Sequence, residues 1–319
     1  MVKTLPTLLI VAKPWQGGLA DYLAQAARAW LGPERVHYVA TRPTTLAGRL
    51  ARARDKRGYD AALLQRIEAI PYDAAIFIHP LEVFAGLRAA ADKHCVWLVD
   101  DGRISPALAA VMGHVFFSDP GYAAEVRASV GEDRYAEVLP FAMDPEMHRP
   151  AATPRTPTRA MCFIANRDAK RTAYLEALYA HGVDCTVYGN YFLKHRLARA
   201  HPTRFRPALP IAAMGQVYAR YRLSLNIHAA VVRAGTNMRS FEAAGYGVPQ
   251  VVEHRPGIEA LFEPEREIAC FTQAEEAVAA YQRLLRDPLA AEQMAERARA
   301  RVLAEHTYTH RLQRMLARV

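Results

Sequence analysis

The chain has 319 residues, of which 51% are hydrophobic and 23% charged, and its formal net charge is +9. This length predicts two domains of roughly 150 residues each, with ordinary globular cores. No apolar run approaches the ~20 residues of a membrane span, and the opening TLPTLLIVA lacks the cleavage site of a signal peptide. We therefore expect a cytoplasmic protein.

The four cysteines, Cys95, Cys162, Cys185 and Cys270, have neither CxxC spacing nor the Cys/His spacing of a zinc site. Each lies in or beside an apolar run, which favours small buried side chains over disulfides. No His, Cys or Asp cluster has metal-ligand spacing, and there is no isolated DxD triplet. We expect no bound metal and no cofactor.

The first part of the chain alternates short apolar runs with helical stretches, as parallel sheets covered by helices do. Helices are predicted at 20–31, across 44–70 and between the third and fourth of six strands, which are predicted at 7–12, 36–41, 73–80, 94–101, 114–119 and 136–141. These units predict one doubly wound α/β domain, residues 1–150.

The segment HRPAATPRTPTR, residues 148–159, contains three prolines and three threonines, which indicates a linker. The alternation then restarts, with strands predicted at 160–166, 184–189, 223–228, 249–253 and 267–271 and helices at 170–181, 237–247 and 274–316. We expect a second doubly wound domain at 151–302. The carboxyl ends of both sheets should line one interdomain cleft, because ligands of such sheets bind there.

Residues 237–253, NMRSFEAAGYGVPQVVE, predict a helix with Asn237 as its N-cap, followed by a strand. The unpaired N–H groups of the helix N-terminus, together with Arg239 and Ser240, would hold a diphosphate. Glu242, one turn further on, would accept both hydroxyls of a ribose. An ordinary amphipathic helix whose Glu242 offsets the dipole would show the same sequence.

The string RSFEAAGYGVP resembles the donor-binding helix of GT-B glycosyltransferases, most closely that of the CgeB-like (spore maturation protein) group related to glycosyltransferase family 4. SLNIH before it, and GIEALFEPEREIACF and RARVLAEHTYTHRLQRML after it, resemble the same group, so the likeness covers roughly residues 94–316. It implies two Rossmann-like domains facing a cleft, with the C-terminal helix 303–319 packed on the first. It further implies that Glu242 binds the ribose of a nucleotide-diphosphate sugar and that Arg239 lies near its phosphates.

One departure from family 4 concerns its two glutamates with seven residues between them. The first would fall at Ala234, so that carboxylate is missing. The contact to the donor sugar is then unassigned, and the stereochemistry of transfer stays open.

A basic cluster follows the strand that ends at Asn166, where Arg167, Lys170 and Arg171 mark a helix start. Cations at such a start oppose the helix dipole, which favours phosphate binding over a merely solvated face. In family 4 an Arg and a Lys at this junction neutralise the donor diphosphate. Tyr188 and His228 each end a strand of the second half and are expected to flank the donor, although core or turn roles fit them equally.

At the strand ends of the first domain, the turn Gly17 and Gly18 is expected near the acceptor or the donor phosphate. Asp21, His79, Asp100 and Asp101 are the catalytic candidates there. Paired glycines let a backbone approach a ligand closely, and a carboxylate within hydrogen-bond reach of a hydroxyl can act as base. A plain tight turn, an Asx turn at the aspartates and a structural histidine are the alternatives.

Two basic stretches have no assigned partner. Arg49, Arg52 and Lys56 are expected on one helix face with Arg54 and Arg57 nearby, and a second group comprises Lys194, His195, Arg196, Arg199, Arg204 and Arg206. Each would suit an anionic membrane surface, an anionic acceptor or nucleic acid, unless it is a solvated face. The sequence thus predicts a glycosyltransferase, with an epimerase-like GT-B enzyme or a non-catalytic nucleotide- or nucleic-acid-binding protein as alternatives.

Overall fold

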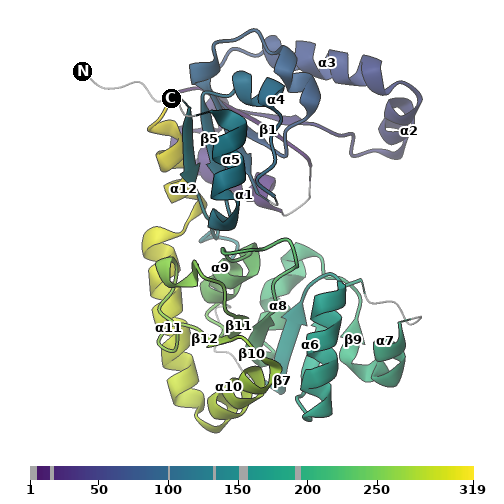
Figure 1. Ribbon diagram of the computed structural model, residues 1–319, viewed down its shortest axis with the longest axis vertical. Helices are drawn as coiled ribbons and strands as arrows, with labels where there is room; N and C mark the ends of the chain where they lie inside the picture. Colours follow the sequence, from purple (N-terminus) through teal and green to yellow (C-terminus); the bar gives the residue numbers. More distant parts are fainter. Residues whose placement is uncertain (1–5, 15–17, 100, 132–133, 151–156, 191–194) are drawn as a thin grey trace. The chain divides into compact units, whose positions relative to one another are not determined.

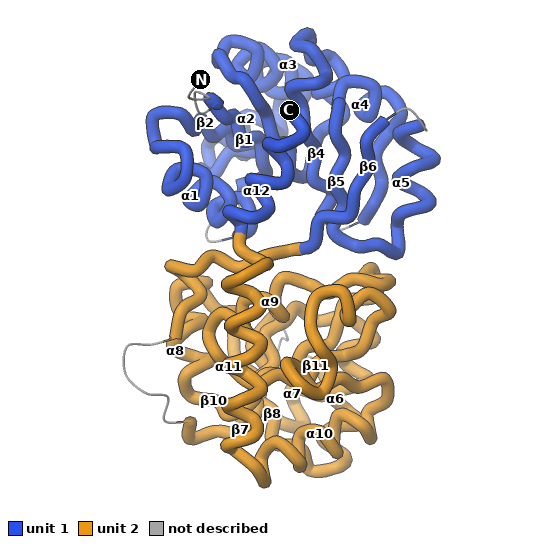
Figure 2. Tube along the Cα trace, turned by 90° about the vertical axis from the view of Figure 1, so that its left-hand side faces the viewer, with its two compact units in different colours: residues 1–140, 308–319 blue, residues 141–307 orange. Residues whose placement is uncertain are grey.

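A computed structural model describes residues 6–14, 18–99, 101–131, 134–150, 157–190 and 195–319. The chain forms two compact units (Figure 1, Figure 2). Unit 1 comprises Met1–Pro140 with Tyr308–Val319, and unit 2 comprises Phe141–Thr307. Much of the expected linker lies outside the described residues, but His148 and its neighbours from Phe141 onwards belong to unit 2.

Unit 1 is built on a six-stranded parallel sheet with the order β2-β1-β3-β4-β5-β6. Its strands are β1 (Leu8–Ala12), β2 (Val36–Ala40), β3 (Ala74–Ile78), β4 (His94–Leu98), β5 (His114–Phe117) and β6 (Tyr135–Val138), and its helices are α1 (Leu19–Leu31), α2 (Leu46–Arg54), α3 (Lys56–Glu68), α4 (Pro106–Ala110), α5 (Ala123–Val130) and α12 (Tyr308–Leu316). Strands β1, β3 and β4 are buried along their whole length, as expected where helices cover both faces of a parallel sheet.

Unit 2 contains a second six-stranded parallel sheet, with the order β12-β11-β10-β7-β8-β9. Its strands are β7 (Arg159–Ile164), β8 (Cys185–Tyr188), β9 (Phe205–Arg206), β10 (Tyr221–Asn226), β11 (Gln250–Glu253) and β12 (Ala269–Phe271), and its helices are α6 (Ala169–Ala180), α7 (Arg196–Ala200), α8 (Met214–Tyr218), α9 (Met238–Gly245), α10 (Ala274–Arg286) and α11 (Pro288–Glu305). The predicted α/β architecture of two doubly wound sheets is confirmed.

The strand order reverses at one point in each sheet, between β1 and β3 in unit 1 and between β7 and β10 in unit 2. Ligands of open α/β sheets bind outside the carboxyl ends of the strands at such a switch point. The topology therefore marks two places to look for function: the loops after β1 and β3, and the loops after β7 and β10.

Helix α12 packs on unit 1 beside α1, although unit 2 precedes it in the chain (Figure 1). Tyr308 is fully buried, with its ring 5.6 Å from that of Tyr22 and 6.5 Å from that of Trp97. Nε of the buried Arg311 donates to the carbonyl of Pro140 at 2.7 Å. These contacts make α12 a structural part of unit 1.

Three sequence predictions of local structure were wrong. The helical stretch 274–316 is interrupted at Asp287, which caps α11, and again between Glu305 and Tyr308. No α-helix separates β3 from β4, because the connection instead forms 3₁₀ turns at Glu82–Gly86 and Ala91–Lys93. The helical stretch across 44–70 is broken at Asp55, which ends α2 and caps α3 by accepting a hydrogen bond from Gly58 N–H. Lys56 therefore does not share a helix with Arg49 and Arg52.

Candidate functional site

A buried network of polar side chains lies at the carboxyl end of β10 and the N-terminus of α9. Asn226 Nδ2 donates to Ser240 Oγ at 2.8 Å and to Asn237 Oδ1 at 3.0 Å. Ser240 Oγ lies 2.7 Å from Thr236 Oγ1, which in turn lies 2.8 Å from Nε2 of His228. Burying so many polar atoms is favourable only when they are hydrogen-bonded, so the network fixes the start of α9 against the strand.

Helix α9 has the start that its sequence predicts, with the Asn237 side chain accepting from Arg239 N–H at 3.1 Å. Six of its residues are buried because α9 packs against β10, β11 and α11. A Cβ at Gly245 would lie 2.7 Å from the backbone oxygen of His148, so only glycine fits there. Gly247 then takes a φ of +68° after the helix, as the GYGVP sequence predicts.

A buried carboxylate, Glu253, is the last residue of β11 and has three partners. Lys170 Nζ lies 2.8 and 2.9 Å from its two oxygens, and Arg255 and the backbone N–H of His228 each donate at 2.8 Å. Burial alone would raise the pKa of Glu253, but the hydrogen bonds from His228 and Lys170 and the nearby charges of Lys170 and Arg255 lower it to about 2. Glu253 is thus an anion that holds Lys170 at the carboxyl ends of the strands.

The predicted basic cluster spans the switch point of unit 2. Arg171 Nε donates to Ile227 O at 2.9 Å and its NH1 donates to Asn166 O at 3.0 Å, so its guanidinium joins the loops after β10 and β7. Asp168 caps α6 by accepting from the N–H of Arg171 at 2.8 Å, which offsets the unfavourable dipole. Arg167 is exposed, and its N–H donates to Asn190 Oδ1 at 2.7 Å.

Glu242, the predicted ribose ligand, is fully buried. Arg239 NH1 donates to its Oε2, and Nε2 of the buried His148 lies 3.7 Å from its Oε1. His148 Nδ1 accepts from Asp144 N–H at 2.9 Å, so the neutral ring carries its proton on Nε2, facing Glu242. Burial lowers the pKa of His148 against the opposing effect of Glu242 and Asp144. A ribose would reach Glu242 only after the atoms that cover it move.

Tyr188 lies apart from this network. Its hydroxyl is 3.1 Å from that of Tyr221, the first residue of β10, and its ring packs on a core cluster beneath α8. These are contacts of the unit 2 core, and the expected place of Tyr188 beside the donor stays a prediction. His228, by contrast, is fully buried within the polar network.

In unit 1, a cavity of about 460 Å³ lies at the switch point of the sheet. Lys13 and His79, which directly follow β1 and β3, line it together with Arg42, Asp101 and Arg103. His79 has a φ of +51°, a strained conformation for a residue other than glycine. The carboxylate of Asp101 accepts from Arg103 Nε at 2.8 Å. The structure thus brings two predicted residues, His79 and Asp101, into one cavity.

The other acceptor-side predictions are less informative. Gly17 and Asp100 lie outside the described residues. Gly18 precedes α1, and its carbonyl accepts from the N–H of Asp21 at 3.0 Å. Asp21 therefore occupies the first turn of α1, where a carboxylate stabilises the helix dipole, and it is not among the described residues that line the cavity.

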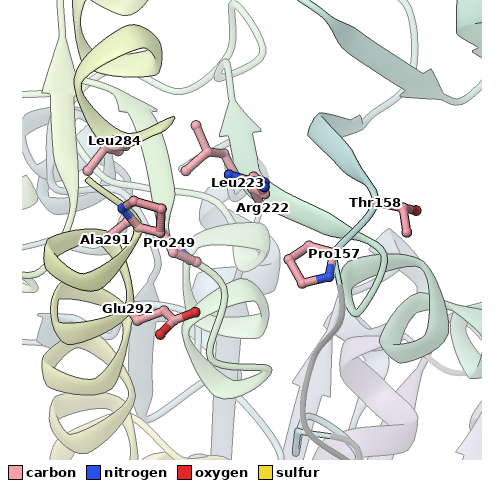
Figure 3. Close-up of a pocket in the computed structure, with 9 residues that line it drawn as sticks. Pro157, Thr158, Arg222, Leu223, Pro249, Leu284, Ala291 and Glu292 are labelled. Atoms are coloured by element: carbon pink, nitrogen blue, oxygen red, sulfur yellow. The ribbon is translucent and has the colours of Figure 1, made fainter. Parts of the chain in front are cut away.

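Another cavity, of about 320 Å³, opens in unit 2 at the amino ends of the strands of its sheet (Figure 3). Thr158 precedes β7, Arg222 and Leu223 lie near the start of β10, and Pro249 precedes β11. These are the amino ends of the strands, away from the buried network. The position argues against a catalytic role, because doubly wound sheets bind ligands at the carboxyl ends.

Sequence reasoning missed several members of the site: Asn226, Thr236, Glu253, Arg255 and His148. Glu253 carries the same signal as Asp100 and Asp101, a carboxylate that ends an apolar run. His148 lies in the segment that was expected to be a linker, and the residues around it in the sequence do not predict a contact with Glu242. Among the described residues, no group of three or more His, Cys, Asp or Glu side chains is arranged to hold a metal ion.

Comparisons with known proteins agree with this geometry. Residues 169–317, somewhat less than half of the chain, match a family described as glycosyl transferase-like. No curated protein matches the sequence. None of the helices in the described ranges has the length and hydropathy of a membrane span.

Solved structures are similar over nearly the whole chain at low identity. A sucrose-phosphate synthase from Thermosynechococcus elongatus is 14% identical with a TM-score of 0.70, over 97% of this chain and 98% of that one. The Anabaena protein HepE, in complex with UDP and glucose, is 14% identical with a TM-score of 0.69, over 98% and 100%. AviGT4, a glycosyltransferase involved in avilamycin A biosynthesis, is 14% identical with a TM-score of 0.62, over 98% and 99%. The chain therefore has the GT-B fold, the two-sheet fold of these glycosyltransferases.

Proposed function

We propose that the chain is a glycosyltransferase in which unit 2 binds a nucleotide-diphosphate sugar and unit 1 binds the acceptor. One observation carries the proposal: a cationic cluster and the capped N-terminus of α9 meet at the switch point of the unit 2 sheet. The glycosyl transferase-like match covers α6 to α12, and so includes the start of α9 and the cations Lys170, Arg171 and Arg255. HepE, which has the same fold, has been crystallised with UDP.

The donor phosphates would lie against Lys170, Arg171 and Arg255. These three cations face two carboxylates, Glu253 and Asp168, so the cluster has an excess of positive charge. Burial lowers the pKa of Lys170, and the hydrogen bond from Lys170 to Glu253 opposes that shift. A leaving diphosphate needs cations fixed beforehand, and Glu253 supplies that fixation.

The nucleoside would lie toward Arg239 and Glu242. Within the described chain Oε1 of Glu242 accepts no hydrogen bond, so this buried carboxylate keeps one acceptor for a ribose hydroxyl. Asn237, Ser240 and His228 would position α9 through the buried network, and Asn166 and Arg167 would border the phosphates. This arrangement agrees with the CgeB-like resemblance. We therefore also propose that the chain belongs to the CgeB-like group, related to glycosyltransferase family 4.

In unit 1, His79 and Asp101 are the proposed acceptor-side groups, because they share a cavity at the switch point. A neutral histidine or a carboxylate can accept the proton of an attacking hydroxyl. No metal ligand set is part of this proposal, so transfer is expected without a metal ion. Addition of EDTA should leave the rate unchanged.

Thermal unfolding in the presence of UDP, GDP, dTDP, NAD and short DNA tests the donor site. A nucleoside diphosphate at about 100 times its Kd should stabilise the protein by about 2.7 kcal/mol. Glu242→Gln keeps the shape of the side chain and should reduce the shift in Tm on adding the nucleotide. Glu275→Gln is the matched control, because Glu275 is exposed on α10.

Stabilisation by NAD or DNA alone would refute the proposal. Equal nucleotide shifts in Glu242→Gln and the control would remove Glu242 from the donor site while leaving the activity open to test. Interconversion of the donor sugar without any acceptor would instead identify the epimerase-like enzyme.

A further inference from the structure

Unit 1 contains a second cavity that adjoins the one with His79 and Asp101. It measures about 370 Å³ and shares Lys13 and Arg42 with its neighbour. Arg49 and Arg52 of α2 complete its charged lining, with Thr44 and two prolines. No carboxylate is among the described residues that line it, so four cations converge on one space.

Two of these cations are held in place by the protein. Arg49 NH2 donates to the carbonyl of Thr44 at 3.2 Å. The guanidinium of Arg52 lies 3.7 Å from Asp60 and over the ring of Tyr59, while its buried Nε donates no hydrogen bond to any described residue. Their side chains therefore approach a ligand already oriented, which lowers the entropic cost of binding it.

The other two cations, Lys13 and Arg42, are exposed and form no ion pair with any residue that the structure describes. The second basic stretch of the sequence differs. There Arg196 pairs with Glu176 at 2.7 Å, and Arg204 bonds to the carbonyl of Val183 and lies 3.6 Å from Asp184. Arg49 and Arg52 of the first stretch line this cavity, whereas no described residue of the second stretch lines any of the cavities described above.

We propose that the acceptor carries a phosphate group and that this cavity binds it. Arginine side chains match phosphate oxygens with paired N–H donors, and a multiply charged anion relieves the mutual repulsion of four cations. A phosphate bound here places the rest of the acceptor beside His79 and Asp101, through the shared Lys13 and Arg42. The role as acceptor site rests on the proposed glycosyltransferase function, whereas the anion site itself does not.

The phosphate can belong to a water-soluble ester or to a lipid headgroup. Leu46 and Leu50 of α2 are 73% and 59% exposed, and would contact the acyl region of a bilayer if the phosphate came from lipid. If the protein binds phosphatidylglycerol vesicles and Leu46→Ser/Leu50→Ser weakens that binding, the phosphate comes from a lipid. If the protein binds glycerol 3-phosphate and the same double change leaves that binding intact, the phosphate comes from a water-soluble ester. Either result supports a phosphate site.

Isothermal titration with inorganic phosphate and glycerol 3-phosphate, with and without UDP, tests the site directly. Arg42→Gln/Arg49→Gln should weaken binding by at least about tenfold, since each loses a charge-assisted contact. Arg54→Gln/Arg57→Gln removes the same charge from the same region, but neither residue lines the cavity, so binding should stay near the wild-type value. Circular dichroism checks that both double variants fold.

No phosphate binding, or equal weakening in both double variants, would overturn the proposal. UDP stabilisation of the wild type is measured in the same series. If UDP stabilises and phosphate does not bind, the acceptor inference fails while the glycosyltransferase proposal stands. If phosphate binds and neither UDP, GDP nor dTDP stabilises the protein, the anion site stands, while the glycosyltransferase proposal fails together with the role of the cavity as acceptor site.

Discussion

Helices α2 and α9 have similar beginnings and opposite surroundings. Each follows the carboxyl end of a strand, and each starts at a side chain that accepts a backbone hydrogen bond, Thr45 in α2 and Asn237 in α9. No residue of α2 is buried, whereas six residues of α9 are, including the polar Ser240 and Glu242. Packing and buried hydrogen bonds thus fix α9, while local capping and surface charge shape α2. The first arrangement suits a ligand that must be held rigidly, and the second suits a charged ligand met at the surface.

The largest expected difference between the two helices concerns their apolar side chains. Phe241 of α9 is fully buried, with its ring 5.6 Å from that of Phe262 and 5.4 Å from that of His306. Phe241→Ala should lower the free energy of unfolding by about 3–5 kcal/mol, since it removes contacts and leaves a cavity. Leu50→Ala in α2 should change it by less than about 0.5 kcal/mol. Urea unfolding followed by circular dichroism measures both, and similar losses would contradict the comparison.

The helix caps provide a second, smaller contrast. Asn237 both caps α9 and exchanges two hydrogen bonds of 3.0 Å with the buried Asn226. Asn237→Ala should therefore cost about 2–3 kcal/mol, because it removes the cap and leaves amide groups of Asn226 unsatisfied. The exposed cap Thr45 accepts only from Gly48 N–H at 3.2 Å, so Thr45→Ala should cost about 0.5–1 kcal/mol. The same unfolding assay applies, and an equal cost at both caps would show that the buried network adds nothing.

The pH dependence of unit 2 stability gives the smallest effect. Burial lowers the pKa values of His148 and His228 below the ordinary 6.5. Below pH 6.5 the unfolded chain binds protons that the folded unit does not, so stability is full above 6.5 and falls as the pH drops toward the folded pKa values. Each histidine contributes at most about 1.4 kcal/mol per pH unit.

His228→Gln should reduce this slope, measured from the Tm of unit 2 between pH 7.5 and about pH 5.5, the range around the histidine reference pKa. Leu50→Ala in α2 is the control and should keep the wild-type slope. A stability that rises on acidification through this range would show that the two histidines are charged in the folded protein.

The main elements of the fold could be predicted from the sequence. Buried parallel strands such as β1, LLIVA, have continuous apolar runs, and α9 carries its own cap and stop signals. The short elements β9, α7 and α8 escaped, because two to five residues show no periodicity. The helix break at Asp55 was not predicted, because an aspartate that follows arginine-rich sequence also fits an exposed position within a continuous helix.

The site was predictable only as far as strand ends identify it. His79, Asp101, His228 and the cluster from Asn166 to Arg171 were expected from that rule. The partners of these residues were not expected. Glu253 binds Lys170 although the two residues are far apart in the sequence, and His148, which lies close to Glu242, belongs to a segment that was predicted to be a linker. Such pairs depend on how strands and helices pack, which no local pattern encodes.

The return of α12 to unit 1 has a consequence for the order of folding. Unit 2 is one continuous stretch of chain, so it can complete its core during synthesis. Unit 1 begins first but waits for α12, which supplies Tyr308 beside Tyr22 and Trp97 and the Arg311 bond to Pro140. During translation the surface that α12 covers, including Tyr22 and Trp97, would therefore stay uncovered until unit 2 has been synthesised. During that interval the uncovered apolar side chains of unit 1 would be most accessible to a chaperone.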